Sequence, residues 1–251
     1  AQNFVGLAER ITDHLGAIER NVPRERMWQV RARRVVLATG AIERPVVFPG
    51  NDRPGIMLAD AVRTYVNRYG ARPGSRAVVL KACDSGYAAA LDLQRAGIEI
   101  AAVLDPRPNA AAHASGLAIS AGATIVATRG RHRVSAVQIG RIGADGAVTA
   151  GEWVRCDLVA MSGGWTPSVH LFSQSRGKVR WDDAARAFLP DLAAPGQAQQ
   201  SAGACRGVFG IGAALADGHA AGAAAVGAAE VVPTYKVSDE PVDYRGIVGA
   251  N

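Results

Sequence analysis

The chain has 251 residues, of which 49% are hydrophobic and 20% are charged, and its formal net charge is +6. These values indicate a globular, soluble chain that is long enough for one large domain or two modest ones. No apolar run reaches the length that a membrane span needs, so no membrane is expected among the partners, and no signal peptide opens the chain.

Cysteine usage and basic clusters bear on location and partners. The three cysteines, Cys83, Cys156 and Cys205, are widely spaced and include no Cys-x-x-Cys pair. This pattern argues against a disulfide framework or a metal site and favours the cytoplasm. The densest basic cluster is three alternating arginines at positions 129–133, which suit a solvated strand face, and no nucleic-acid-binding motif accompanies them.

The first part of the chain predicts strands. Residues 3–14 and 28–32 carry the apolar residues of two strands, with a polar loop between them. Residues 35–38, Val-Val-Leu-Ala, predict a strand buried on both faces, and Gly40 allows a tight turn at its end. No glycine-rich strand–turn–helix precedes this strand, so we expect the chain to be a piece of something longer.

The middle of the chain alternates helices and strands. Helices are predicted over residues 58–68 and 87–96, and buried strands over 77–80 and 98–104. The strand, turn, helix and strand from residue 77 onward make a βαβ unit that ends at Asp105. The next predicted elements are a helix over 116–121, strands over 124–127, 134–142 and 153–156 around an Asp145-Gly146 hairpin turn, and a strand over 158–161.

The last part of the chain is less regular. A polar stretch over 173–183 leads to a Pro- and Gln-rich loop over 191–201. A strand is predicted over 207–212 and a helix of small residues over 220–229. Residues 233–251 contain turn residues and little periodicity, which is typical of a tail or linker.

Four segments resemble the alpha-subunit family of heterotetrameric sarcosine oxidases. They are residues 33–55, 61–69, 162–182 and 203–218, and the likeness extends to about residue 230. The most specific segment is SGGWTPSVHLFSQS from residue 162, whereas the ATG at 38–40 is shared by the large superfamily of two-dinucleotide-domain flavoprotein disulfide reductases. The resemblance implies an α/β fold with tandem Rossmann-like domains of the FAD/NAD(P)-binding, thioredoxin-reductase-like type, the first of them incomplete here.

We divide the chain on this basis. Residues 1–49 and 196–251 are expected to form part of the first, cofactor-binding dinucleotide domain. Residues 70–165 are expected to form a second, degenerate nucleotide-binding-like domain, with 166–195 as a connecting segment. The two strand-end glycine motifs and the late return of the chain at 208–212 support this division.

The resemblance also implies a function. It implies an oxidoreductase acting on CH–NH groups that converts sarcosine to glycine and formaldehyde with peroxide formation, this chain contributing NAD binding and subunit assembly. In such an enzyme FMN and FAD belong to the assembled complex, the other subunits are the partners, and folate binds through a domain not present here. The alternatives are a subunit of another amine, opine or imino-acid oxidoreductase, or a non-catalytic scaffold. We expect the isolated chain to be inactive.

The expected cofactor contacts lie at two places. One is the end of the predicted strand over 35–38, and the other is the late return of the chain to the first domain at 208–212. Open α/β sheets place ligands at the carboxyl ends of their strands. FAD-binding relatives usually have Gly-Asp at the late return, but this chain has Gly212-Ala213, which favours an occupant other than FAD. We assign no catalytic residue, and a structural role is favoured for His170. The predicted cofactor-binding residues are Thr39, Gly40, Ala41, Gly210, Gly212 and Ala213.

The second nucleotide-like unit is expected to have lost its ligand. Superfamily members with a working site resemble V-I-G-G-G-D-S-A where this chain has V-L-K-A-C-D-S-G at 79–86. Lys81 and Cys83 therefore stand where glycines allow the turn and the close approach of pyrophosphate, while Gly86 keeps the third position small. Asp105 lies about where an acid would bind ribose, but it is more typical of a strand-end turn. Lys81 could instead attract phosphate, an alternative that we consider weaker.

Overall fold

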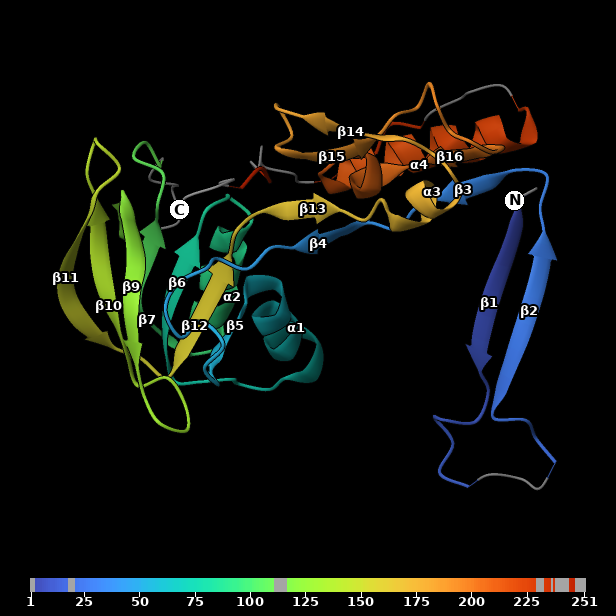
Figure 1. Ribbon diagram of the computed structural model, residues 1–251. Coiled ribbons are helices and arrows are strands. Elements are labelled where there is room, and N and C mark those ends of the chain that lie inside the picture. The colour runs from blue at the N-terminus through green and yellow to red at the C-terminus, as the bar shows by residue number, and fades with distance from the viewer. Residues whose placement is uncertain are drawn as a thin grey trace. The chain divides into compact units, whose positions relative to one another are not determined.

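The computed structural model describes residues 3–17, 21–110, 117–228, 233–235, 237 and 244–246. The chain divides into two compact units (Figure 1). Unit 1 comprises Ala1–Ala41, Pro167–Asp183 and Ala187–Asp239, and unit 2 comprises Ile42–Thr166, Ala184–Arg186 and Glu240–Asn251. Among the described residues, no helix combines the length and the apolar character that crossing a membrane requires.

Unit 2 is built on a parallel sheet of five strands in the order β5-β12-β6-β7-β8. Residues 77–80 of β6 have no exposed surface, which explains why this stretch is apolar without alternation. Parallel neighbours need crossovers, and α1 (Ala59–Tyr69) and α2 (Gly86–Arg95) belong to two of them. The βαβ unit predicted from residue 77 is thus confirmed. The strands are β5 (Ile56–Leu58), β6 (Arg76–Lys81), β7 (Glu99–Asp105), β8 (Ile119–Ala121) and β12 (Leu158–Ser162).

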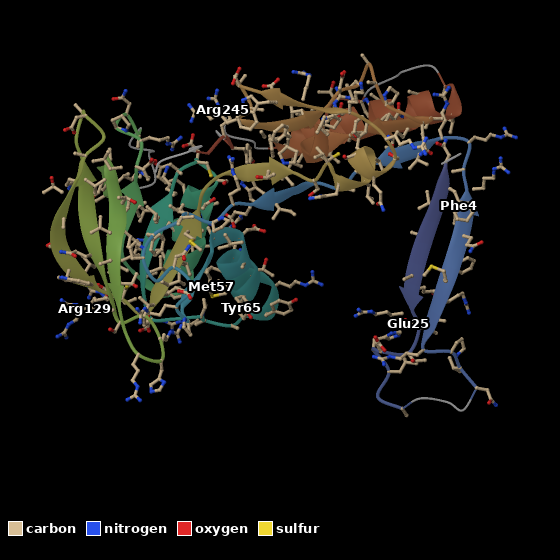
Figure 2. All side chains as sticks on the ribbon, in the orientation of Figure 1. Phe4, Glu25, Met57, Tyr65, Arg129 and Arg245 are labelled. Atoms are coloured by element: carbon tan, nitrogen blue, oxygen red, sulfur yellow. The ribbon has the colours of Figure 1, made fainter. Side chains whose placement is uncertain are left out.

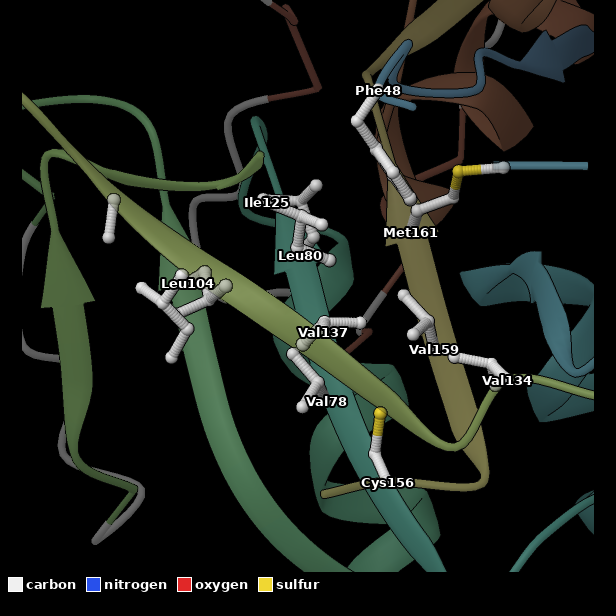
Figure 3. Packing of buried hydrophobic residues seen from close by; sticks show 12 residues of the cluster. Phe48, Val78, Leu80, Leu104, Ile125, Val134, Val137, Cys156, Val159 and Met161 are labelled. Atoms are coloured by element: carbon white, nitrogen blue, oxygen red, sulfur yellow. The ribbon is translucent and has the colours of Figure 1, made fainter. Parts of the chain in front are cut away.

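Two layers cover the parallel sheet, one on each face. On one face Val79 packs with Val62 of α1 and Leu93 of α2. On the other face Val78 and Leu80 pack against an antiparallel sheet in the order β11-β10-β9 (Figure 3). Alternate residues of β6 thus serve two separate cores, as the two-residue period of a strand requires. The covering strands are β9 (Ala123–Arg129), β10 (Ala136–Ile142) and β11 (Val148–Arg155).

The described residues of unit 1 form three strand pairs, two short helices and one longer helix. β1 (Phe4–Arg10) and β2 (Glu25–Arg31) form an antiparallel hairpin. β3 (Val35–Leu37) runs parallel to β16 (Gln199–Ser201) and contacts the helix α4 (Ile211–Val226). The remaining elements are α3 (His170–Gln174), the antiparallel pair of β14 (Val179–Asp182) and β15 (Ala187–Pro190), and the 3-10 helix η1 (Gly203–Arg206). β4 (Ala41–Glu43) pairs with β13 (Trp165–Pro167) where the chain passes between the units.

The structure corrects three secondary-structure expectations. In place of a helix ending at residue 121, β8 extends the sheet beside β7. In place of a strand over 207–212, the chain turns and α4 begins at Ile211, because the φ angles of Gly207 and Gly210, 87° and 89°, lie outside the strand region. β3 is only partly buried, with Val36 36% exposed, because β16 alone pairs with it in the described chain. Most of the expected tail over 233–251 lies outside the described residues.

The domain limits predicted from the sequence stay a prediction. The segment 166–195, expected to be a connection, carries α3, β14 and β15, and most of it belongs to unit 1.

Candidate functional site

The first group of predicted site residues lies at the end of β3. Thr39 Oγ1 donates a hydrogen bond to the carbonyl of Ser168 at 2.7 Å, and the amide of Ser168 donates to the carbonyl of Gly40 at 2.9 Å. Gly40 has a φ of 69°, but residues 38–40 form neither a turn nor a bend between β3 and β4, so the tight turn predicted there is wrong; a Cβ on Gly40 would meet no atom within 4 Å. Ala41 begins β4. The backbone at the end of this strand is therefore open on one side.

The second group lies at the start of α4. Gly210 is the residue that precedes the helix, and Gly212 and Ala213 lie in its first turn. Two contacts fix the direction of α4: the amide of Gly203 donates to Asp217 Oδ2 at 2.7 Å, and the Gln200 side chain donates to the carbonyl of Ala221. α4 therefore runs antiparallel to β16, and its N-terminus lies toward the carboxyl ends of β16 and β3.

These two groups thus lie on the same side of unit 1. Amide groups in the first turn of a helix point outward and attract anions such as phosphate. The sequence did not single out Ser168, which bonds both Thr39 and Gly40 in the segment between β3 and β4. The only available signal was its position in the SGGWTPSVHLFSQS segment.

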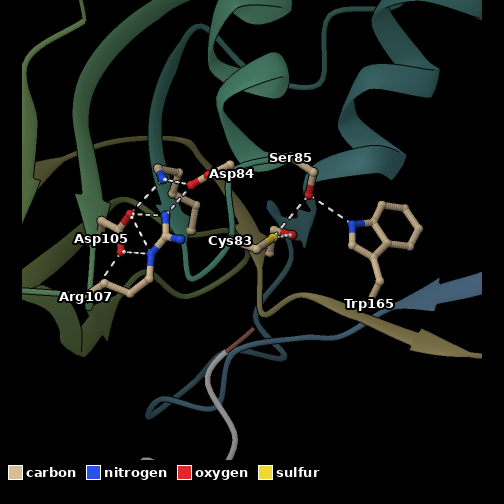
Figure 4. A network of polar contacts seen from close by, with 8 residues as sticks. Cys83, Asp84, Ser85, Asp105, Arg107 and Trp165 are labelled. Atoms are coloured by element: carbon tan, nitrogen blue, oxygen red, sulfur yellow. Dashed lines mark hydrogen bonds and ion pairs between the residues drawn. The ribbon is translucent and has the colours of Figure 1, made fainter. Parts of the chain in front are cut away.

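The corresponding place in unit 2 is filled by a buried ion cluster (Figure 4). Lys81 ends β6 and Asp105 ends β7, and Lys81 Nζ lies 2.6 Å from Asp105 Oδ2. Neither side chain is exposed. The ammonium of Lys81 also lies 3.3 Å from the ring centre of Tyr87 on α2, a favourable cation–π contact. The cluster therefore joins two strand ends to the helix that connects them.

Arg107 and Asp84 complete the cluster. Arg107 Nη2 donates to Asp105 Oδ2 at 2.8 Å and to Asp84 Oδ1 at 2.5 Å. Burial by itself would raise the pKa of Asp105, but hydrogen bonds from Arg107 and Lys81 outweigh it and hold the pKa below its ordinary value. Burial lowers the pKa of Lys81, and its bond to Asp105 offsets this in part. Two cations and two carboxylates therefore balance inside the unit.

The hydrogen bonds of the cluster occupy the carboxylate oxygens that would otherwise bind the ribose of a dinucleotide. Asp105 Oδ1 accepts the backbone amide of Arg107 at 2.9 Å, so both carboxylate oxygens are bonded within the chain. Lys81 is folded inward: a Cβ on Gly86 would lie 2.6 Å from the Cβ of Lys81. The small residue at position 86 thus lets α2 approach the Lys81 side chain, and that side chain is buried and paired instead of projecting toward a ligand.

A row of polar side chains continues along the same edge of the sheet. Ser85 accepts a hydrogen bond from Trp165 Nε1 at 2.9 Å, and its hydroxyl lies 3.1 Å from the thiol of Cys83. The thiol also lies 3.3 Å from the hydroxyl of Ser162, which is hydrogen-bonded to the carboxyl of Glu43. This row joins β4, β12 and β13 to the turn after β6.

Glu43 ends the row and has a second contact. Its Oε2 accepts the backbone amide of Asp60 in the first turn of α1 at 2.8 Å, and the side chain is buried. Burial raises the pKa of Glu43, and the bonds with Ser162 and the Asp60 amide offset only part of that effect. Sequence reasoning missed Glu43 and Trp165, because no local pattern shows that a carboxyl from a distant strand bonds the start of a helix.

Two solved structures show the fold to which the chain belongs. A ferredoxin reductase from Rhodopseudomonas palustris aligns with 83% of this chain and 55% of its own, with a TM-score of 0.58 and 17% identity. The thioredoxin reductase of T. acidophilum aligns with 81% of this chain and 65% of its own, with a TM-score of 0.53 and 16% identity. The chain thus has the α/β fold of FAD/NAD(P)-binding oxidoreductases, and the fold class predicted from the sequence is confirmed.

Sequence relatives are more specific. The alpha subunit of sarcosine oxidase from Corynebacterium sp. (strain P-1) is 44% identical over 90% of this chain and 24% of that protein. The alpha subunit from Rhizobium meliloti (strain 1021) is 37% identical over 87% of this chain and 21% of that protein. An opine oxidase subunit from Agrobacterium tumefaciens (strain Ach5) is 29% identical over 83% of this chain and 46% of that protein. No protein-family model matches the chain.

The chain is therefore a homologue of the sarcosine oxidase alpha subunit, and the resemblance stated from the sequence is confirmed. It spans about a quarter of the length of these relatives.

The buried cluster gives a prediction for stability. Asp105→Asn should lower the free energy of unfolding by about 3–5 kcal/mol, because it leaves the Lys81 ammonium buried beside a neutral partner. Adding Lys81→Met should recover part of that loss, since the pair of Arg107 and Asp84 remains. Urea unfolding at pH 7 measures both. If the double variant is less stable than Asp105→Asn, the cluster does not act as a charge-balanced unit.

Glu43 gives a prediction for pH dependence. A carboxyl with a raised folded-state pKa stabilises the fold when protonated and loses that contribution as pH rises through the folded-state pKa. Glu43→Gln removes the titration, so its stability relative to the unchanged chain should rise from pH 4 to pH 7. Unfolding measured across this range tests the sign, with Glu99→Gln, whose side chain is 60% exposed, as the control. A relative stability that falls with pH would contradict the assignment.

Proposed function

We propose that this chain is part of the alpha subunit of a sarcosine oxidase, to which it contributes NAD binding and subunit assembly. The observation that carries the proposal is the 44% identity with such a protein over 90% of the chain. In the proposed reaction the N-methyl group of sarcosine is oxidised to the level of an imine, water releases formaldehyde and glycine, and dioxygen is reduced to hydrogen peroxide. FMN and FAD in the assembled complex supply the redox chemistry.

The residues of unit 1 fit a dinucleotide phosphate better than a flavin side chain. Ala213 lies in the first turn of α4, where the helix N-terminus favours phosphate, and Gly40 leaves the facing strand end open. Ala213 has no carboxylate to accept a hydrogen bond from a ribityl chain. We propose that Thr39, Gly40, Ala41 and the start of α4 contribute part of the NAD site, the rest coming from a segment that contains a glycine-rich turn.

Unit 2 is proposed to bind no NAD(P) and to serve folding and assembly. Both carboxylate oxygens of Asp105, the acid at the ribose position, are hydrogen-bonded within the chain. The Lys81 side chain at the end of β6 is buried and paired with Asp105. A converging set of backbone amides is what holds pyrophosphate in working sites, and one buried ammonium does not replace it.

The partners of this chain and the alternatives to its main function are proposed by analogy with its relatives. We propose a cytoplasmic hetero-oligomer with the other sarcosine oxidase subunits, in which folate binds through a domain that this chain does not include. A component of another amine, opine or imino-acid oxidoreductase is the second candidate, supported by the 29% identity with an opine oxidase subunit. A non-catalytic scaffold is the third, since no residue of this chain was assigned to catalysis.

Peroxide production tests the function. The full-length chain, purified with its other subunits, should produce peroxide with sarcosine and much less with an opine, whereas residues 1–251 alone should produce none because the cofactors that do the redox chemistry are held elsewhere. Turnover of the opine in preference to sarcosine would favour the second candidate. Sarcosine-dependent peroxide from the chain alone would refute the division of roles.

NAD binding tests the proposed site. In the full-length chain Ala213→Asp should weaken NAD binding roughly tenfold, because a carboxylate in the first turn of α4 repels phosphate. Ser85→Trp, which blocks the turn in unit 2, is the control and should leave the affinity unchanged. Isothermal titration with NAD measures both. The reverse result, binding lost only in Ser85→Trp, would place the dinucleotide in unit 2.

A further inference from the structure

The outer edge of unit 2 is a long strand with one free side. β11 has eight residues and, within the described part of the chain, pairs only with β10 (Figure 1). Five of its residues, 148–152, are exposed in succession. Monomeric proteins usually protect such an edge with proline, lysine or shortness, because its free amides and carbonyls can pair with another chain. β11, Val-Thr-Ala-Gly-Glu-Trp-Val-Arg, has neither proline nor lysine, although a register shift interrupts its pairing with β10 between Gln138 and Gly140.

The face of the sheet beside this edge carries arginines around a tryptophan. The guanidinium carbon of Arg129 lies 3.8 Å from the ring centre of Trp153 on β11 (Arg129 is labelled in Figure 2). Ala136 of β10 lies directly opposite Arg129 on one side and Arg155 on the other. Since Val137, the next residue of β10, points into the core, these three residues share the outer face.

The segment that forms this antiparallel sheet has an excess of positive charge. Residues 123–155 contain five arginines and two acids, Asp145 and Glu152. Asp145 accepts the backbone amide of Ala147 within the hairpin turn. Neither Arg129 nor Arg155 forms an ion pair with any described residue, and both are exposed. Arg129 on β9 and Arg155 on β11 lie on either side of Ala136 of β10, so an anion placed over Ala136 would be attracted by both arginines.

We propose that the β11 edge is a docking site for an extended, acidic segment of another subunit. The segment adds to β11 as a further strand, so that main-chain hydrogen bonds supply affinity. Its carboxylates lie over Arg129 and Arg155, and Trp153 supplies the central contact, as tryptophan and arginine commonly do in interfaces. The inference rests on the proposed function, in which this chain is one component of a hetero-oligomer.

Two other occupants fit less well. A second copy of this chain, paired β11 to β11, would bring the arginines of both copies together without a counter-charge. A nucleic acid would match the arginines but would leave the free amides and carbonyls of β11 without strand partners. An acidic polypeptide satisfies the charge and the edge at once.

The test uses the full-length chain assembled with its other subunits. Amide hydrogen exchange of β11 should slow on assembly, and Arg129→Glu with Arg155→Glu should weaken assembly roughly tenfold or more, because repulsion replaces attraction. Arg68→Glu with Arg72→Glu changes the net charge equally at exposed positions outside this sheet and should change assembly by less than about twofold. Thermal unfolding checks that each variant folds, and Arg129→Gln with Arg155→Gln replaces the reversal variant if it does not.

The outcomes separate this inference from the proposed function. One outcome is that the subunits assemble while the amides of β11 exchange freely and the variant with Arg129→Glu and Arg155→Glu assembles normally. In that case the docking site is wrong and the proposed role in the oxidase stands. If protection of β11 appears in a homodimer, or disappears on nuclease treatment, the occupant is a second copy or a nucleic acid and the proposal is overturned. If the unchanged chain forms no hetero-oligomer, the proposed function itself fails and the docking proposal with it.

Discussion

The ion pair of Lys81 and Asp105 is the interaction on which one edge of the unit 2 sheet depends, the edge at the carboxyl ends of β6 and β7. Removing two charges from water is costly, and only close pairing with further hydrogen bonds offsets that cost. The pair meets this condition through Arg107 and the face of Tyr87. Because its members come from the ends of neighbouring strands, it closes the edge of the sheet where related folds admit a ligand. The rest of the unit can remain an ordinary α/β layer structure.

Much of unit 2 could be predicted from the sequence, whereas much of unit 1 could not. Residues 77–80 lie in a fully buried strand, so a simple apolar run identified them. In unit 1 the same apolar signal at 35–38 belongs to a three-residue strand that is partly exposed. The stretch 207–212 contains the apolar residues of a strand, but Gly207 and Gly210 adopt positive φ angles and α4 begins at Ile211. Composition alone does not reveal a backbone conformation of this kind.

The candidate sites show the same division. Comparison with the glycine-rich motif of the superfamily showed that Lys81 and Cys83 stand where that motif has glycines. The bonds from Glu43 to the start of α1 and from Trp165 to Ser85 join residues far apart in the sequence. Such contacts depend on how the crossovers bring strand ends together. A single sequence contains no signal for them beyond the presence of polar residues near strand ends.

The balanced cluster also limits the single substitutions that unit 2 can accept without losing stability. Replacing Lys81 by glycine alone would leave Asp105 buried with only Arg107, and removing Asp105 alone would leave the buried Lys81 ammonium with only Asp84, 3.7 Å away. Each of these single substitutions therefore gives a less stable protein, since a buried charge that loses its closest partner is destabilising. The four charges are balanced only as a set, so the stability of unit 2 depends on keeping this edge of the sheet closed.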